Sequence, residues 1–151
     1  MYNIIFIIYK RFMTTFYQNI QSKYNIQHSS NNVTVELCIR LHELGFKFYT
    51  EFKRANCRFD LVVWSLDEQY IIACIEVKLH KKSTVDIYPN MYRNTKQKTK
   101  YLKQTSCDPL FYYADLLFCT SFEMVESVAQ AVRAAQAKYE RLKPKTIHTI
   151  T

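Results

Sequence analysis

The sequence predicts one α/β domain built on a mixed sheet, with elements in the order α-β-β-β-α-β-α. Three observations lead to this fold class. The chain has 151 residues, 48% of them hydrophobic, which is enough for one core. Residues 57–65 and 70–80 are apolar on both faces and rich in Val and Ile, as interior strands are. Residues 33–44 and 125–142 carry apolar residues at helical spacing instead. We take residues 31–143 as the domain core and residues 1–30 as an N-terminal extension.

The first predicted helix follows the polar segment at residues 29–32. Four apolar residues then recur at steps of four, four and three: Val33, Leu37, Leu41 and Leu44. This spacing places them on one helical face. Gly45 follows, and glycine most easily takes the left-handed conformation that ends a helix. Residues 46–54 alternate apolar and polar side chains, so we expect a strand with one exposed face.

The two interior strands are separated only by the polar residues 66–69, and so they should form a hairpin. A basic stretch at residues 90–105 is predicted to be helical, and residues 109–119 to form another buried strand. Thr120 and Glu123 have the spacing of a capping box, which opens a final helix.

The final predicted helix carries a narrow apolar stripe. Its six positions are spaced 3-4-3-4-3: Val125, Val128, Val132, Ala135, Tyr139 and Leu142. A helix that packs on its own core usually buries a wider face, so the stripe resembles a helix–helix contact between subunits. Packing on the chain's own sheet is the alternative, because a stripe at helical spacing is more often intramolecular.

Composition narrows the function classes. The formal net charge is +8, which favours an anionic partner such as nucleic acid, although acidic lipid or acidic protein would also be attracted. The one glycine cannot supply a phosphate-binding loop or a nucleophile elbow. The five cysteines have no C-x-x-C spacing, so we expect reduced thiols in a cytoplasmic protein. The apolar run at residues 4–9 is too short to be a signal peptide or to span a membrane.

Charged residues interrupt the two interior strands. Asp60 lies in the first, and Glu76 and Lys78 lie two apart in the second. Alternate side chains of a strand share a face, so Glu76 and Lys78 point the same way, and Asp60 is expected on the face of Val62 and Trp64. The hairpin would then bring two carboxylates and one ammonium together. Mg²⁺ or Mn²⁺ would relieve the repulsion between the carboxylates. A structural ion pair at the end of the sheet is the alternative.

Two further carboxylates are candidates for the same site. Glu36 lies at the edge of the apolar face of the first helix, which aims it toward the core. A solvated charge on the flank of the helix is the alternative for Glu36. Glu51, in the first strand, is the weaker candidate.

A basic segment follows the second interior strand. Between Lys78 and Lys103 there are eight Lys or Arg residues and one acid, Asp86. Phosphate groups are the natural counter-charge, and interleaved Tyr, Asn and Gln side chains would reach base edges. The residues expected to contact DNA are Lys81, Lys82, Tyr88, Asn90, Tyr92, Arg93, Asn94, Lys96, Gln97, Lys98, Lys100 and Lys103. A solvated lysine-rich loop and helix is the alternative.

The order of these elements, with Asp60 in one strand and Glu76-x-Lys78 in the next, resembles the PD-(D/E)XK nuclease superfamily. The resemblance covers about residues 33–120, and Phe59 stands where the family's motif has Pro. It implies a restriction-endonuclease-like αβββαβ core with an additional C-terminal helix. It also implies catalytic roles for Asp60, Glu76 and Lys78, with Glu36 as an auxiliary carboxylate and Asp60 and Glu76 as ligands of Mg²⁺ or Mn²⁺.

Within that superfamily, the chain is most similar to the small homing endonucleases of bacterial group I introns. This resemblance implies cleavage of double-stranded DNA at a long specific site by a homo-oligomer, a tetramer more than a dimer. Two alternatives stay open: a structure-specific nuclease resembling a Holliday junction resolvase, and a non-catalytic DNA-binding protein. The presence of Asp60, Glu76 and Lys78 favours the homing endonuclease and the resolvase over the non-catalytic DNA-binding protein.

Overall fold

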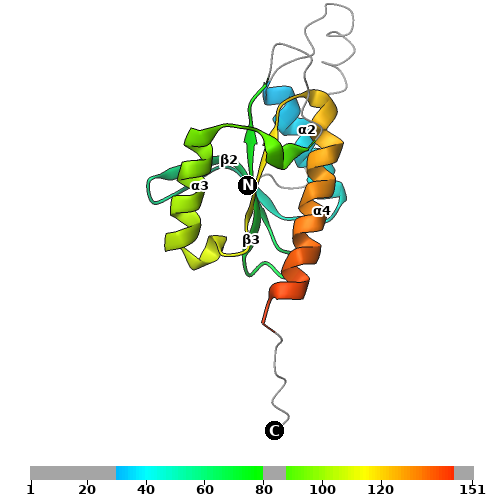
Figure 1. Cartoon of the computed structure of the whole chain (residues 1–151). Helices are drawn as coiled ribbons and strands as arrows, with labels where there is room; N and C mark the ends of the chain where they lie inside the picture. Colours follow the sequence, from blue (N-terminus) through cyan, green and yellow to red (C-terminus); the bar gives the residue numbers. More distant parts are fainter. Residues whose placement is uncertain (1–29, 80–87, 145–151) are drawn as a thin grey trace, which may run out of the picture.

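A computed structural model describes residues 30–79 and 88–144, and in it helices cover both faces of a four-stranded sheet (Figure 1). The elements are α2 (Ser30–Glu43), β1 (Phe48–Arg54), β2 (Cys57–Trp64), β3 (Ile71–Val77), α3 (Thr95–Cys107), β4 (Asp115–Cys119) and α4 (Val125–Leu142). Short 3-10 turns lie at Pro89–Met91, Pro109–Phe111 and Phe122–Met124. The predicted class, an α/β domain with a mixed sheet, is confirmed.

The strands lie in the order β1-β2-β3-β4. β1, β2 and β3 pair antiparallel, whereas β3 and β4 pair in parallel. The predicted hairpin of β2 and β3 is therefore confirmed. A parallel pair needs a crossover connection, and the chain between β3 and β4 supplies one that includes α3. All seven residues of β3 are buried, as expected for a strand with neighbours on both sides and helices on both faces.

The two faces of the sheet carry separate apolar clusters, which we name the first and second core. The first core joins α2 and α4 to the sheet, and includes Leu37, Leu41, Leu61, Ile75, Val128 and Val132. The second core lies on the α3 side, and includes Phe59, Val62, Cys74 and Phe111, with Tyr101 of α3 packed against it. Figure 1 shows α3 on one side of the strands and α2 and α4 on the other.

The predicted first helix is confirmed as α2. Val33, Leu37 and Leu41 are fully buried, and Leu44 packs against the same core. Gly45 has a φ of +86°, so the left-handed residue that ends the helix is where it was predicted. Val35, Cys38 and Ile39 are also buried, which makes the buried surface of α2 wider than one stripe.

The apolar stripe of α4 faces the chain's own core, and its interpretation as a contact between subunits was wrong. Val128 and Val132 are fully buried, and Tyr139 is 2% exposed. They pack in the first core against α2 and the sheet. Only the last residue of the stripe, Leu142, is largely exposed, at 60%. The buried face of α4 is wider than the stripe, because Ala129 and Gln136 are buried as well.

Three local predictions need correction. The capping box is absent: the Thr120 hydroxyl lies 2.8 Å from Met124 Sδ, and a 3-10 turn at Phe122–Met124 precedes α4. The strand expected at residues 109–119 is a 3-10 turn followed by the shorter β4, since Pro109 sets a turn that Asp108 caps. The basic helix begins at Thr95, not at residue 90. All five cysteines are free thiols, as expected.

Candidate active site

Asp60 and Glu76 lie side by side on neighbouring strands. Leu61 pairs with Ile75, so the antiparallel register places Asp60 opposite Glu76. The backbone N–H of Asp60 donates to Glu76 Oε1 at 3.4 Å, and the backbone N–H of Val77 donates to Asp60 Oδ2 at 2.9 Å. The backbone pairing of the two strands stops at Leu61 and Ile75. Beyond that point each carboxylate accepts a hydrogen bond from a backbone N–H group of the opposite strand. The structure thus brings the two predicted carboxylates together.

The alternation of β2 breaks at Asp60. Phe59 and Val62 both pack in the second core, whereas Leu61 packs in the first. Strict alternation would place Phe59 with Leu61. The facing residue on β1, Glu51, has a φ of 50°, which marks an irregular backbone at the same level. The prediction that Asp60 shares a face with Val62 and Trp64 rested on strict alternation, which does not hold through this residue.

Glu76 is buried, with 2% of the residue exposed. Burial first, then the charge of Asp60 and a side-chain hydrogen bond with Asp60, raise the pKa of Glu76 to about 8. The charge of Lys78 and the backbone N–H of Asp60 act in the opposite direction. At neutral pH the Glu76 carboxyl group is therefore mostly protonated, because its charged form would be buried beside a second carboxylate.

Lys78 follows the last residue of β3. Its backbone N–H donates to the carbonyl oxygen of Cys119 at 2.9 Å, which fixes Lys78 against the end of β4. The residue is half-buried, and its charge lowers the pKa of Glu76, so the ammonium acts directly on that carboxyl group. The three residues Asp60, Glu76 and Lys78 gather at one end of the sheet.

The auxiliary carboxylates do not complete a cluster with this pair. Within residues 30–79 and 88–144, no group of three or more His, Cys, Asp or Glu side chains is arranged to hold a metal ion. Glu36 is half-buried on α2, and α2 covers the face of the sheet that carries the first core. Glu76 lies on the same side of β3 as Cys74, which packs in the second core on the opposite face. Glu51 is exposed and bonds Arg58 at 3.0 Å.

The donor chemistry of the pair suits a hard divalent cation. Mg²⁺ is typically held by one or two protein carboxylates, with water and phosphate oxygens in its other positions. Asp60 and Glu76 are the residues that would hold it, and a cation there would replace the proton of Glu76 and offset the repulsion that raises its pKa.

The predicted DNA-contacting residues differ in exposure. Lys81 and Lys82 lie outside the described residues. Tyr88, Asn90, Arg93, Lys96 and Lys103 are exposed, and Lys98 and Lys100 are half-buried. The α3 sequence holds four lysines and no acid, so this surface is strongly basic, as predicted.

Three residues of the basic segment have structural contacts. Tyr92 packs on Phe118, with ring centroids 4.8 Å apart, and Phe118 pairs with Glu76 in the sheet. The side chain of Asn94 accepts a hydrogen bond from the backbone N–H of Gln97 and so caps α3. Gln97 Oε1 is buried and has no hydrogen-bond partner among the residues that the structure describes. Asn94 therefore positions the basic helix, a role that sequence reasoning missed although Asn is a preferred capping residue.

The contribution of β4 was also missed. The carbonyl oxygen of Cys119 accepts a hydrogen bond from the backbone N–H of Lys78, and the ring of Phe118 packs against Tyr92. Both contacts join residues far apart in the sequence, so no local pattern in residues 115–119 predicts them.

Fold and site together describe a class of protein. It is a mixed α/β domain that pairs a buried carboxyl group with a half-buried one, next to a lysine, and carries a basic helix on one face of its sheet. Comparison with protein-family models gave no match, and searches of curated proteins and of solved structures gave none either. None of the helices within residues 30–79 and 88–144 combines the length and apolar character needed to cross a membrane.

Proposed function

We propose that this chain is a metal-dependent endonuclease of the restriction-endonuclease-like type that hydrolyses phosphodiester bonds in DNA. The observation that carries the proposal is the adjacency of Asp60 and Glu76, with Glu76 only 2% exposed. A carboxyl group that is buried beside a second carboxylate costs stability, because its charged form is desolvated and repelled, and an apolar side chain at the same position would be cheaper. Such an arrangement is typical of a functional site.

The topology supports the same proposal. A helix, three antiparallel strands, a crossover helix and a fourth strand parallel to the third follow the αβββαβ order of the PD-(D/E)XK resemblance. In that arrangement the carboxylates come from the two central strands, as Asp60 and Glu76 do here.

Asp60, Glu76 and Lys78 divide two roles in the proposed reaction. Asp60 and Glu76 would hold Mg²⁺ or Mn²⁺. When bound, such an ion lowers the pKa of water and stabilises negative charge on a phosphate. Lys78 orients the attacking water and offsets charge that builds on the phosphate oxygens.

The proposed substrate is double-stranded DNA with a long specific site, as for a homing endonuclease. The lysines of α3 provide contacts to phosphates, and the exposed Asn90 and Arg93 provide contacts to base edges. Cutting both strands requires two copies of the site, so the active form is proposed to be a homo-oligomer, with a tetramer favoured over a dimer. Since the α4 stripe is buried within the chain, the contact between subunits must use other surfaces.

A cleavage assay in Mg²⁺ tests the proposal, with plasmid, linear duplex and four-way junction as substrates and Glu76→Gln as the matched inactive control. The wild-type protein should cut duplex DNA at discrete positions, and Glu76→Gln should not. Preferred cutting of the junction would indicate a resolvase instead. Tight DNA binding by the wild-type protein with no cleavage of any substrate in Mg²⁺ or Mn²⁺ would contradict the nuclease assignment.

A further inference from the structure

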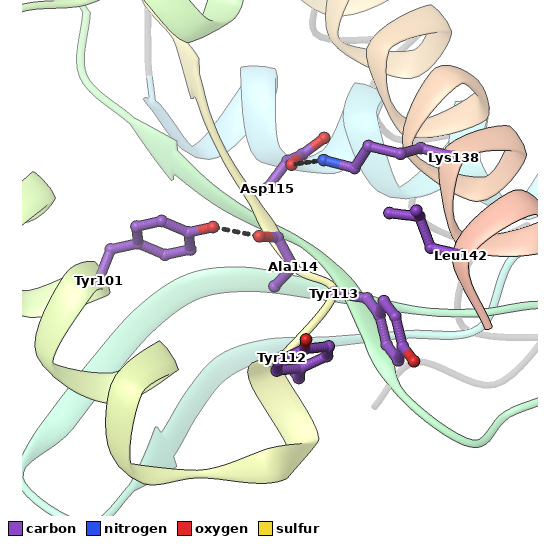
Figure 2. A pocket seen from close by; sticks show the side chains of 7 residues that line it. All are labelled: Tyr101, Tyr112, Tyr113, Ala114, Asp115, Lys138 and Leu142. Carbon is purple, nitrogen blue, oxygen red and sulfur yellow. Dashed lines mark hydrogen bonds and ion pairs between the residues drawn. The ribbon is translucent and has the colours of Figure 1, made fainter. Parts of the chain in front are cut away.

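A pocket of about 430 Å³ lies beside the amino end of β4, which is the edge strand of the sheet as described. Its volume falls in the range of roughly 300 to 1,000 Å³ that is usual for small-molecule sites. Figure 2 shows Tyr101 reaching it from α3, Lys138 and Leu142 from α4, and Tyr112 and Tyr113 from the turn before β4. The pocket therefore spans the strand edge between the two helices that cover opposite faces of the sheet.

The aromatic walls of the pocket are fixed to different degrees. The Tyr101 hydroxyl donates to the carbonyl oxygen of Ala114, which holds its ring in place. Tyr113 packs edge-on against Tyr70 and Tyr139, with centroids 4.9 and 5.1 Å apart. Tyr112 stands edge-on to Tyr113 at 4.8 Å and is 71% exposed. A rigid cluster thus supports one tyrosine ring whose surface is open to solvent.

The polar part of the pocket is an ion pair between Asp115 and Lys138. Their charges cancel, so the pocket offers no net charge to a phosphate or to a cation. Each side chain is more than a third exposed, which leaves carboxylate lone pairs and ammonium protons available to a ligand. A carboxylate accepts from amino and ring N–H groups, and an ammonium donates to carbonyl and ring nitrogen acceptors.

We propose that this pocket binds an unpaired nucleobase of the DNA substrate. A nucleobase is planar and neutral, so it can stack on Tyr112 while its polar edge meets Asp115 and Lys138. Stacking of bases on aromatic side chains is the usual way in which proteins hold unpaired nucleotides. The choice of a nucleobase among aromatic ligands rests on the function proposed above.

The pocket lies close enough to the carboxylate pair to act on the same DNA molecule. Asp115 pairs with Ala73 and Phe118 with Glu76, so the two sites are three residues apart along β4, or about 10 Å at 3.3 Å per residue. That distance is about three nucleotide rises of 3.4 Å. A DNA strand held at Asp60 and Glu76 would therefore place an unpaired base near the pocket, which indicates a substrate with a bulge, loop or flipped base close to the cut.

The test uses DNA with 2-aminopurine at an unpaired position, in EDTA so that no cutting occurs. A duplex with a one-base bulge, a single strand and a fully paired duplex each carry a second dye for anisotropy. Stacking on Tyr112 should quench the 2-aminopurine emission of the bulged duplex and the single strand in a saturable way. Tyr112→Ala and Asp115→Asn should each reduce this quenching at least five-fold, with paired-duplex anisotropy unchanged.

Leu66→Ala is the matched control, since Leu66 is 54% exposed and lies in the β2–β3 turn, outside the lining of the pocket. Two results would overturn the nucleobase assignment and leave the nuclease proposal intact. In the first, anisotropy shows DNA binding but the 2-aminopurine emission does not change. In the second, both pocket variants quench the emission as strongly as the wild type does.

If no DNA binding is seen, a second experiment tests the nucleobase pocket separately from the proposed nuclease function. Free dCMP and N-acetyltyrosinamide are titrated separately while the ring resonances of the pocket tyrosines are followed by NMR. Saturable shifts with dCMP that disappear in Asp115→Asn support the nucleobase pocket. A response to N-acetyltyrosinamide alone, or to neither compound, overturns it, and the first of these results would indicate a protein partner.

Discussion

Asp60 and Glu76 each accept a hydrogen bond from the backbone of the other's strand: the N–H of Asp60 donates to Glu76 Oε1, and the N–H of Val77 donates to Asp60 Oδ2. The carboxylates are therefore positioned by the same hairpin that builds the centre of the sheet. A site positioned by backbone in this way is rigid, so changes in the chemistry of either side chain need not disturb the fold.

Stability should depend on the ionisation of Glu76. The pKa of Glu76 is about 8 in the folded chain, against an ordinary value of 4.5. Between these values the folded state keeps a proton that the unfolded state has lost, so stability is fully present below about pH 4.5 and falls as pH rises toward 8. Melting temperatures measured in EDTA from pH 5 to 9 should show this fall.

Glu76→Gln is the control for that pH dependence, because an amide resembles the protonated carboxyl group and does not titrate. The melting temperature of this variant should change much less between pH 5 and 8 than that of the wild type. In the wild type, Mg²⁺ should raise the melting temperature more at pH 8.5 than at pH 5.5, since protons compete with the cation. An identical pH profile in the two proteins would mean that Glu76 is not the group responsible.

Cleavage should require Asp60, Glu76 and Lys78. Asp60→Asn or Glu76→Gln should reduce the cutting rate to below about a tenth of wild type, because loss of one ligand removes several kcal/mol of charge stabilisation. DNA affinity measured in parallel should persist. Lys78→Ala should be nearly inactive and still bind Mg²⁺ in calorimetry. A variant of Asp60 or Glu76 that cuts faster than a tenth of wild type would show that the ligands are assigned wrongly.

The salt dependence of DNA binding should locate the interface on α3. Lys96 and Lys103 are exposed on this helix, and each lost phosphate contact should reduce the slope of log K against log salt by about 0.9. The double variant Lys96→Ala, Lys103→Ala should thus flatten the slope by about 1.8 if each lysine makes one contact. Arg141→Ala, at the end of α4, should leave it unchanged. An unaltered slope in the double variant would move the interface away from α3.

Aspartate in the α4 stripe should unfold the chain. Val132 is fully buried, so Val132→Asp places an unpaired carboxylate in the first core, at a cost that is large compared with typical stabilities. Circular dichroism should show loss of helix at 25 °C. Ala134→Asp, an exposed change on the same helix, should keep the fold. Light scattering on Ala134→Asp then reports on assembly: a lower mass than wild type would place a subunit contact on the outer face of α4.

Local patterns in the sequence determined most of the element order. Strand and helix periodicity identified α2 and the pair β2 and β3, because those patterns reflect which side chains must be buried. The short polar turn at residues 66–69 predicted the hairpin, but it did not fix the register at Asp60. Trp64 pairs with Ile71 whereas Val63 pairs with Ala73, and this one-residue shift is what brings Asp60 opposite Glu76. Gly45 ended α2 for a reason confined to its own backbone, its φ of +86°.

The tertiary structure decided what depends on contacts between distant residues. Nothing in the α4 stripe distinguishes a groove in the chain's own core from another subunit, since both bury the same apolar side chains. The raised pKa of Glu76 comes from burial and from Asp60 sixteen residues away, and the pocket joins α3, β4 and α4. Periodicity reports which side of an element is apolar; only packing sets which surface covers that side and which polar groups are left facing one another.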